Sequence, residues 1–223
     1  MAPAGNPALP RPRPGRVVLQ GRYARLEPLS GAHAEGLYEA SIGEGAAERF
    51  VFLPAHPPSR IADMLAWLEQ AANADDRIYS AVVDPASGAA LGRQSLMRFV
   101  PEHGVIEIGD ILWGPRMART RIATEALYLA ARYVFDDLGY RRFEWKCNHL
   151  NAPSKKAALR FGFAFEGVFR QHMWVKGANR DTAWFAMLDR DWPRLRREYE
   201  RWLDPANFDV QGIQRSALDV SQA

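Results

Sequence analysis

The pattern of hydrophobic and polar positions predicts alternating strands and helices along most of the chain. The strongest signal covers residues 120–138, where two neighbouring lines of apolar residues form a stripe wide enough to pack against a sheet. Gly139 follows this stripe and is suited to end a helix there. Shorter helices are predicted after the N-cap candidate Ser30, after the N-cap candidate Ser59, between Pro153 and Gly162, and in the segment WPRLRREYERWL.

Strand patterns occupy most of the segments between these helices. The segment RRFEWKCN alternates Phe143, Trp145 and Cys147 with polar residues, which predicts a half-buried strand. The other strand signals are VVLQGRYARLEPL (an opening hairpin or strand), RIYSAVVD, ALGRQSLMRFV, VIEIGDILW, and the hairpin pair FEGVFRQHMWVKG and TAWFAMLD. The order of elements therefore predicts an α/β (α+β) fold, with a mixed sheet of about seven strands and helices on both of its faces.

The ends of the chain differ from its centre in composition. Residues 1–15 contain five prolines and few large aliphatic residues, so they are expected to form a tail that is mobile or strapped to the domain. Residues 16–205 are expected to form a single domain, because they are long enough to bury a full core. Residues 206–223 are predicted to be a C-terminal tail.

Composition narrows the classes of function. A net charge of +3 is too small to indicate a nucleic-acid partner, and no apolar run reaches the length of a membrane span. The single cysteine, Cys147, fits a reducing compartment, and the N-terminus lacks a secretory signal, so a cytoplasmic location is expected. The five histidines show no metal-ligand spacing, and no metal site is predicted.

The segment RMARTRIATEAL places three arginines directly before the predicted helix 120–138. A helix N-terminus attracts anions through its free amides and its dipole, and small residues let an anion approach the backbone. The alternatives are a phosphate-binding turn and a solvated basic loop. A second group of polar residues follows the strand RRFEWKCN, where Asn148, His149, Asn151 and Ser154 can hydrogen bond to an amide-rich ligand.

From about residue 20 to residue 193 the sequence resembles the GNAT superfamily of N-acetyltransferases, and within it the RimJ/RimL-type branch. The resemblance is carried by RTRIATEAL, by FDDLGYRRFEWKCNHLNAPSKKAALRFGFAFEGVFRQ and by KGANRDTAWFAMLDRDWP. It implies a mostly antiparallel GNAT sheet with a splay between two central strands, and acetyl-CoA (coenzyme A) as cosubstrate. The usual Q/R-x-x-G-x-G/A loop is altered here, because Ala118 and Arg121 replace two of its residues and only Ala123 fits.

The resemblance also implies which residues hold the cofactor. The pyrophosphate is expected on the turn at 118–123, the pantetheine arm in the splay, and the distal end of the cofactor at Asn151. Arg119 and Arg121 are expected to bind either the pyrophosphate or the 3′-phosphate. The full set of expected cofactor-binding residues is Ile111, Leu112, Trp113, Ala118, Arg119, Thr120, Arg121, Ile122, Ala123, Thr124, Asn148, Asn151 and Ser154.

Two residues are expected to be catalytic. Glu107 is the first candidate for a base that acts through water, ahead of Asp110 and Glu166, and the alternative is an ordinary outward strand carboxylate. Ser154 is expected to protonate the leaving thiolate, because the sequence has no tyrosine between residues 141 and 198; the alternative is a serine that only satisfies a helix start.

The expected function is transfer of an acetyl group from acetyl-CoA to a primary amine, either a protein N-terminal α-amine or a small-molecule amine, by direct attack on the thioester. A non-catalytic acyl-CoA-binding module and an interaction protein that uses its basic C-terminal helix remain alternatives. A homodimer contact through the C-terminal tail also remains open. The acceptor itself is not encoded in any motif of the sequence.

Overall fold

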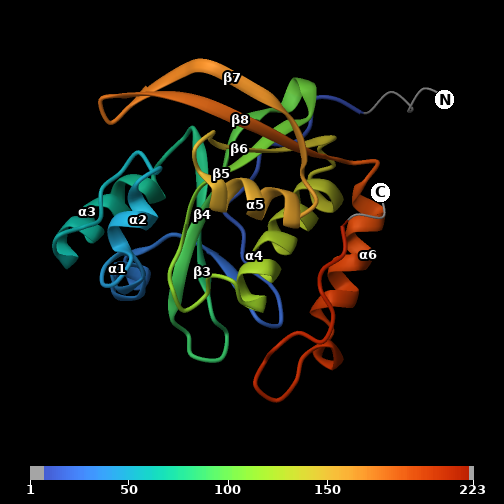
Figure 1. Cartoon of the computed structure of the whole chain (residues 1–223), viewed down its shortest axis with the longest axis horizontal. Coiled ribbons are helices and arrows are strands. Elements are labelled where there is room, and N and C mark those ends of the chain that lie inside the picture. Colours follow the sequence, from blue (N-terminus) through green and yellow to red (C-terminus); the bar gives the residue numbers. More distant parts are fainter. Residues whose placement is uncertain (1–7, 221–223) are drawn as a thin grey trace.

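The computed structural model describes residues 8–220, which form one eight-stranded sheet with helices on both of its faces (Figure 1). Its strands are β1 (Leu19–Gln20), β2 (Arg25–Pro28), β3 (Arg77–Val83), β4 (Ala90–Val100), β5 (Val105–Trp113), β6 (Arg142–Asn148), β7 (Ala164–Val175) and β8 (Ala178–Leu188). Its α-helices are α1 (Ala34–Ser41), α2 (Ala46–Phe50), α3 (Ile61–Ala72), α4 (Arg121–Arg132), α5 (Ala152–Arg160) and α6 (Trp192–Leu203).

The strands follow the order β1-β2-β3-β4-β5-β6-β8-β7 across the sheet. Every neighbouring pair is antiparallel except β5 and β6, which run parallel. The predicted mixed, mostly antiparallel sheet is confirmed. The strand count is eight rather than seven because the opening segment forms a hairpin of two short strands, β1 and β2.

The two faces of the sheet are covered by different helices, which Figure 1 shows on opposite sides. One face packs against α4 and α6, and the Gln94 side chain of β4 points to this side, donating to the carbonyl of Ala126 at 3.1 Å. The opposite face of β3 and β4 carries α1 and α3, whose buried Leu37 and Leu68 pack on Ala81. Side chains alternate between faces along a strand, so Arg93 and Ser95 point away from α4.

Three helices differ in detail from their sequence-based predictions. The helix at 120–138 is α-helical only in α4, and Tyr133–Asp137 continue it as a π-helical turn before Gly139 ends it at φ +68° as predicted. The N-cap of α3 is Arg60 rather than Ser59, because the Asp63 carboxylate reaches back to the amides of both residues. The five-residue helix α2 was not predicted, since it is too short to show a periodic pattern.

The terminal segments lie against the domain where the structure describes them. In the segment predicted as an N-terminal tail, the amide of Arg11 donates to the carbonyl of Pro101 at 3.0 Å, and Gly15 donates to the Tyr133 hydroxyl at 2.9 Å. Residues 1–7 of that prediction lie outside the described residues. In the segment predicted as a C-terminal tail, Phe208 and Leu218 are buried, so residues 206–220 pack against the domain beside α6.

Glu125 of α4 fixes the opening hairpin onto the helix. Its side chain is buried and accepts hydrogen bonds from the amides of Arg22 (3.0 Å), Tyr23 (2.5 Å) and Ala24 (2.6 Å). A carboxylate with three backbone donors satisfies a turn that no strand partner can reach. The hairpin β1–β2 therefore depends on a residue that lies about a hundred positions later in the sequence.

We expect Glu125→Ala to lower the free energy of unfolding by about 3 kcal/mol, because it leaves buried backbone donors without an acceptor. Glu125→Gln keeps one acceptor oxygen and should cost less. Chemical denaturation of both variants beside the unmodified protein measures the difference. A loss below about 0.5 kcal/mol for the alanine variant, typical of a surface substitution, would show that water replaces the carboxylate without penalty.

Candidate functional site

The site is built around the point where the two parallel strands separate. β5 and β6 pair from Val105↔Arg142 to Ile108↔Trp145, and no further pair joins them in the described part of the chain. Each strand nevertheless continues, β5 against β4 as far as Trp113 and β6 against β8 as far as Asn148. The backbone edges of 109–113 and 146–148 therefore face each other without pairing. This is the splay that the sequence predicted between these two strands.

A β-bulge at Asp110 turns β5 away from β6. Asp110 has φ +48°, a left-handed conformation that costs energy for a residue with a side chain, and the register with β4 shifts at this position. Side chains of β4 compensate, since Arg93 Nη1 donates to the Asp110 carbonyl at 2.9 Å and Ser95 Oγ donates to the Gly109 carbonyl at 2.9 Å. The bulge is thus held from the neighbouring strand.

The Asp110 side chain completes a buried polar network with Arg93 and Tyr79. Its Oδ1 lies 2.9 Å from Arg93 Nη1, and its Oδ2 accepts a hydrogen bond from the Tyr79 hydroxyl. Burial, followed by the charge of Asp110, raises the pKa of Tyr79 to about 12, so the hydroxyl remains a donor at neutral pH. Trp67 of α3 covers the network, with its ring 4.2 Å from the Arg93 guanidinium.

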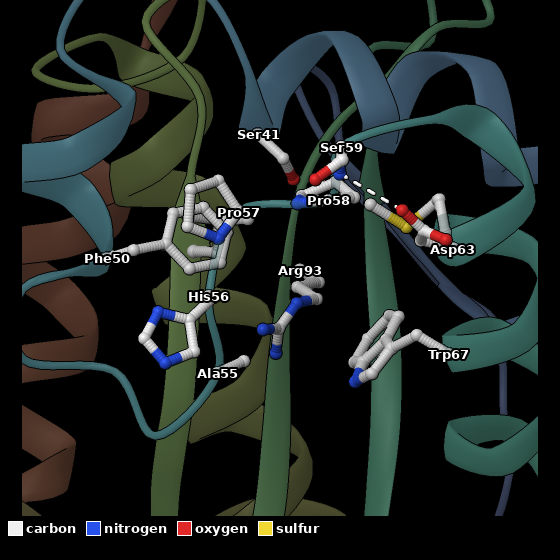
Figure 2. A pocket seen from close by; sticks show the side chains of 12 residues that line it. Ser41, Phe50, Ala55, His56, Pro57, Pro58, Ser59, Asp63, Trp67 and Arg93 are labelled. Carbon is white, nitrogen blue, oxygen red and sulfur yellow. Dashed lines mark hydrogen bonds between the residues drawn. The ribbon is translucent and has the colours of Figure 1, made fainter. Parts of the chain in front are cut away.

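A cavity of roughly 200 Å³ opens over this network on the face away from α4. Figure 2 shows the Arg93 guanidinium pointing into it between His56 and Trp67, with Phe50 on the same side as His56. Leu112, on β5 beyond the bulge, also lines the cavity, which places the cavity beside the splay. The arrangement suits a partly apolar ligand that reaches toward the gap between β5 and β6.

Glu107 lies on the same sheet face and is not the ordinary outward carboxylate that was its alternative. Its side chain is 2% exposed, and its Oε2 lies 3.0 Å from Lys146 Nζ and 3.2 Å from Arg98 Nε. Burial raises the pKa of Glu107, and the neighbouring charge of Lys146 works in the opposite direction. Burial likewise lowers the pKa of Lys146. Glu107 and Lys146 therefore form an ion pair that is removed from water, in which each charge stabilises the other.

The turn before α4 combines a helix start with unpaired arginines. Thr120 is the N-cap, and its hydroxyl accepts from the Ile122 amide at 3.2 Å. Arg119 has φ +65° and is exposed, whereas the guanidinium of Arg121 lies 4.3 Å from the Tyr23 ring. Neither arginine pairs with a carboxylate anywhere in residues 8–220. The amides of Ala118 and Thr120 donate hydrogen bonds within the turn, so only backbone amides of its other residues are left to bind an anion.

The turn between β6 and α5 brings three predicted residues together. The side-chain oxygen of Asn148 accepts from the Leu150 amide at 2.9 Å, and that of Asn151 caps α5 by accepting from the Ser154 amide at 3.0 Å. Ser154 Oγ accepts a hydrogen bond from Trp145 Nε1 at 3.0 Å. The asparagine oxygens thus shape the turn, while Ser154 is bonded to the face of β6 that packs on α4.

Several residues of the site had no signal in the sequence. Arg93, Tyr79 and Trp67 come from three separate elements, and no motif links them. Arg160 of α5 is another, since its Nη1 donates to Thr124 Oγ1 in the first turn of α4 at 3.1 Å. This contact in the folded structure adds Arg160 to Arg119 and Arg121 as a third cation near the start of α4. Of the other carboxylates considered as bases, Glu166 pairs with Arg142 at 2.6 Å.

Comparison with known proteins identifies the fold. A family model described as an acetyltransferase (GNAT) domain matches residues 24–164, well over half of the chain. The chain belongs to the GNAT acetyltransferase family. The matched region contains the splay, the turn before α4 and the whole of α5, and it ends where the β7–β8 hairpin begins.

Solved structures of GNAT proteins are similar over almost the whole chain. A GCN5-related N-acetyltransferase from Brucella melitensis is 53% identical, with a TM-score of 0.92 over 95% of this chain and 96% of that one. A protein from Chromobacterium violaceum assigned to the GNAT acetyltransferases is 37% identical, with a TM-score of 0.76 over 85% of this chain and 94% of that one. A Vibrio cholerae protein described as a ribosomal-protein-serine acetyltransferase shares only the fold, at 17% identity and TM-score 0.67 over 77% and 97% of the two chains. No curated protein matches the chain.

GNAT enzymes use acetyl-CoA, and three features of this structure fit that cosubstrate. The unpaired edges of the splay offer backbone groups to the amides of a pantetheine arm. The first turn of α4 offers amides and arginines without carboxylate partners to phosphates. Trp113 Nε1, on the splayed end of β5, is buried without a partner. Within residues 8–220, no group of His, Cys, Asp and Glu side chains is arranged to hold a metal ion, and no helix is long and apolar enough to cross a membrane.

Proposed function

We propose that this GNAT protein transfers the acetyl group of acetyl-CoA to a primary amine by direct attack of the amine on the thioester. The separation of β5 from β6 carries the proposal. It joins the phosphate-binding end of α4 on one face of the sheet to the cavity over Arg93 on the other. A thioester lying in this gap would meet an amine entering from the cavity. The free, buried Cys147 supports a reducing, cytoplasmic setting.

We place the acceptor among protein N-terminal α-amines, as in the RimJ/RimL-type branch that the sequence resembles. An α-amine has a pKa of about 7.7–8.0 and is partly neutral at physiological pH, whereas a lysine ε-amine near 10.4 is mostly charged. A site with a single buried carboxylate as base is better matched to the α-amine. A small-molecule amine is the second candidate, because the cavity over Arg93 is small. A non-catalytic acyl-CoA-binding module would bind the cosubstrate and release no thiol.

In the proposed mechanism, this chain's residues hold the reactants and move two protons. Glu107 accepts the proton of the incoming amine through a water molecule, and Lys146 and Arg98 keep its carboxylate ionised until then. Ser154 donates its hydroxyl proton to the thiolate that leaves. Ser154 Oγ accepts from Trp145 Nε1, which leaves its own hydrogen to be donated, and the Cys147 thiol is its other side-chain neighbour. Backbone amides of the splayed strand stabilise the charge that develops on the carbonyl oxygen.

Thiol release from acetyl-CoA, measured across peptides with different first residues and across small amines, tests the function itself. Calorimetric titration with CoA tests the binding site. We expect Arg119→Ala combined with Arg121→Ala to weaken CoA binding by about tenfold or more, because hydrogen bonds to charged groups contribute about 1.5–3 kcal/mol. The loss should shrink at high salt, since screening weakens such pairs.

Arg197→Ala, on the exposed surface of α6, is the matched control and should leave CoA binding unchanged. Single variants separate the two arginines, because Arg121 also packs on Tyr23 and its loss should lower stability as well. CoA affinity that is unchanged in the double variant would place the phosphates elsewhere.

Glu107→Gln should lower kcat by about a hundredfold or more while CoA affinity is retained, because a general base contributes about 10²–10⁴-fold. The carboxylate must be ionised to act, so activity of the unmodified protein should fall as the pH falls through the pKa of Glu107, which burial has raised. The variant should lose this acidic limb of the pH–rate profile. Glu69→Gln, which alters an exposed carboxylate of α3, is the control. An acidic limb that persists in Glu107→Gln would assign the base to Asp110 or to no residue.

Ser154→Ala should lower kcat with little change in CoA affinity, because the hydroxyl acts in the transition state more than in the ground state. A thioester with a poorer leaving thiol should enlarge the defect, and one with a better leaving thiol should mask it. Ser154→Thr keeps a hydroxyl and controls for the lost hydrogen bond to Trp145. Full turnover in Ser154→Ala with a normal acceptor would leave Ser154 as a helix-start residue and solvent as the proton donor.

A further inference from the structure

The β7–β8 hairpin closes the acceptor side of the sheet. Figure 1 shows the hairpin extending over the sheet toward the side that carries α1, α2 and α3. At its tip, Lys176 Nζ donates to the carbonyl of Phe50 at the end of α2, at 2.8 Å. Phe50 also lines the cavity over Arg93. Phe50 therefore connects the wall of the cavity to the tip of the hairpin.

The underside of this hairpin carries an excess of positive charge. Lys146 of β6 and Arg98 of β4 lie over the Trp184 ring of β8, with distances to the ring centroid of 5.3 and 5.7 Å. Arg180 lies on the same face of β8 as Thr182 and Trp184, because side chains alternate between the two faces along a strand. Lys146 and Arg98 thus meet on the Trp184 ring, and Arg180 extends the positive charge along the same face of β8. Burial is the largest cause of the lowered pKa of Lys146, and the charges of Arg98 and Arg180 also lower it.

Glu107 is the carboxylate that these cations share. Its Oε2 lies within ion-pair distance of Lys146 and Arg98, and no ion pair in residues 8–220 includes Arg180. His172, which contacts the Trp184 ring, adds no negative charge, and burial followed by the charge of Lys146 lowers its pKa. Three cations thus lie near Glu107, and the neighbouring carboxylate of Glu144 is paired with Arg142. We call Arg98, Lys146, Arg180 and Trp184 the basic cluster.

Two buried donors in the basic cluster have no acceptor. Trp184 is 9% exposed, and its Nε1 has no hydrogen-bond partner. Arg180 Nε is also buried without a partner. The Arg180 side chain as a whole is only partly buried, but its Nε–H and the Trp184 indole N–H are withdrawn from water. Burying N–H donors without acceptors is unfavourable, so such donors normally meet an acceptor in the functional state. Excess positive charge and unpaired donors at one place together indicate a missing anion.

We propose that the acceptor amine carries an anionic group, a carboxylate or a phosphate, which the basic cluster binds beneath the β7–β8 hairpin. This rests on the proposed function, because it assumes that the acceptor enters on this face. Glu107, the proposed base, forms ion pairs with two residues of the cluster, so the anionic group lies close to the reacting amine. Peptides that begin with an acidic residue carry such an anionic group, and so do small amino acids.

Thiol release with matched acceptors tests the specificity. Peptides beginning with Asp or Glu are compared with peptides beginning with Asn or Gln, and β-alanine and aminomethylphosphonate are compared with propylamine. The anionic member of each pair should have a kcat/KM higher by about tenfold or more, as expected for a hydrogen bond to a charged group. The peptide and small-molecule arms distinguish the two sources of the anion, and the phosphonate distinguishes phosphate from carboxylate.

Arg180→Gln should remove most of the preference for anionic acceptors by raising their KM, while the neutral member of each pair reacts as before. Arg180→Lys should restore part of it, and Arg170→Gln, an exposed arginine of β7, is the matched control. Circular dichroism checks that each variant is folded. Equal rates for anionic and neutral acceptors, unchanged in Arg180→Gln, would overturn the proposal.

A binding measurement separates this proposal from the proposed function. In protein with ¹⁵N-labelled indoles, the Trp184 Nε1–H resonance, assigned through Trp184→Phe, should shift when succinate or inorganic phosphate is added and should not shift in Arg180→Gln. If no amine releases thiol but this resonance shifts, the anion site stands and the acetyltransferase proposal fails. If amines react rapidly and the resonance does not move, the anion site is wrong and the acetyltransferase proposal stands.

Discussion

The bulge at Asp110 is the constraint on which the rest of the site depends. A parallel pair of strands that hydrogen bonds along its whole length has no free edge to offer a ligand. Here a left-handed residue turns β5 outward, and the strain is compensated because Arg93 and Ser95 bond the two carbonyls that the bulge exposes toward β4. The unpaired edges of β5 and β6 are the result. Every ligand-binding feature described above is placed relative to this gap.

The bulge also explains why so much charge is buried on one face of the sheet. Arg93 supports the bulge and needs Asp110 as its counter-ion, and Trp67 shields both from water. Three residues before Asp110 on β5, Glu107 is held by Lys146 and Arg98. Buried ion pairs seldom stabilise a fold more than apolar packing does, because their desolvation offsets their attraction. Two such networks beside one gap are therefore better explained by chemistry than by stability.

The sequence predicted the parts of the site that depend on local rules. The apolar stripe of α4, the stop at Gly139 and the alternation of Phe143, Trp145 and Cys147 are periodic, and the structure has them as predicted. The network of Arg93 with Asp110 could not be predicted in the same way. It joins neighbouring strands through a register shift of one residue, and a register shift leaves no pattern in the sequence. The site as a whole depends on such long-range contacts, whereas the turn before α4, where phosphate binding is proposed, is a local structure.

The region that the family model matches ends where the β7–β8 hairpin begins. The family match ends at residue 164, where β7 begins, so the elements that shape the splay and the turn before α4 are shared within the family. The hairpin that closes the acceptor side lies beyond that match. In this chain it contacts α2 through Lys176 and buries Trp184. In the proposed function the central strands hold the cosubstrate and the hairpin lies on the acceptor side, so a change in the hairpin would alter acceptor choice while the bulge and the splay remain intact.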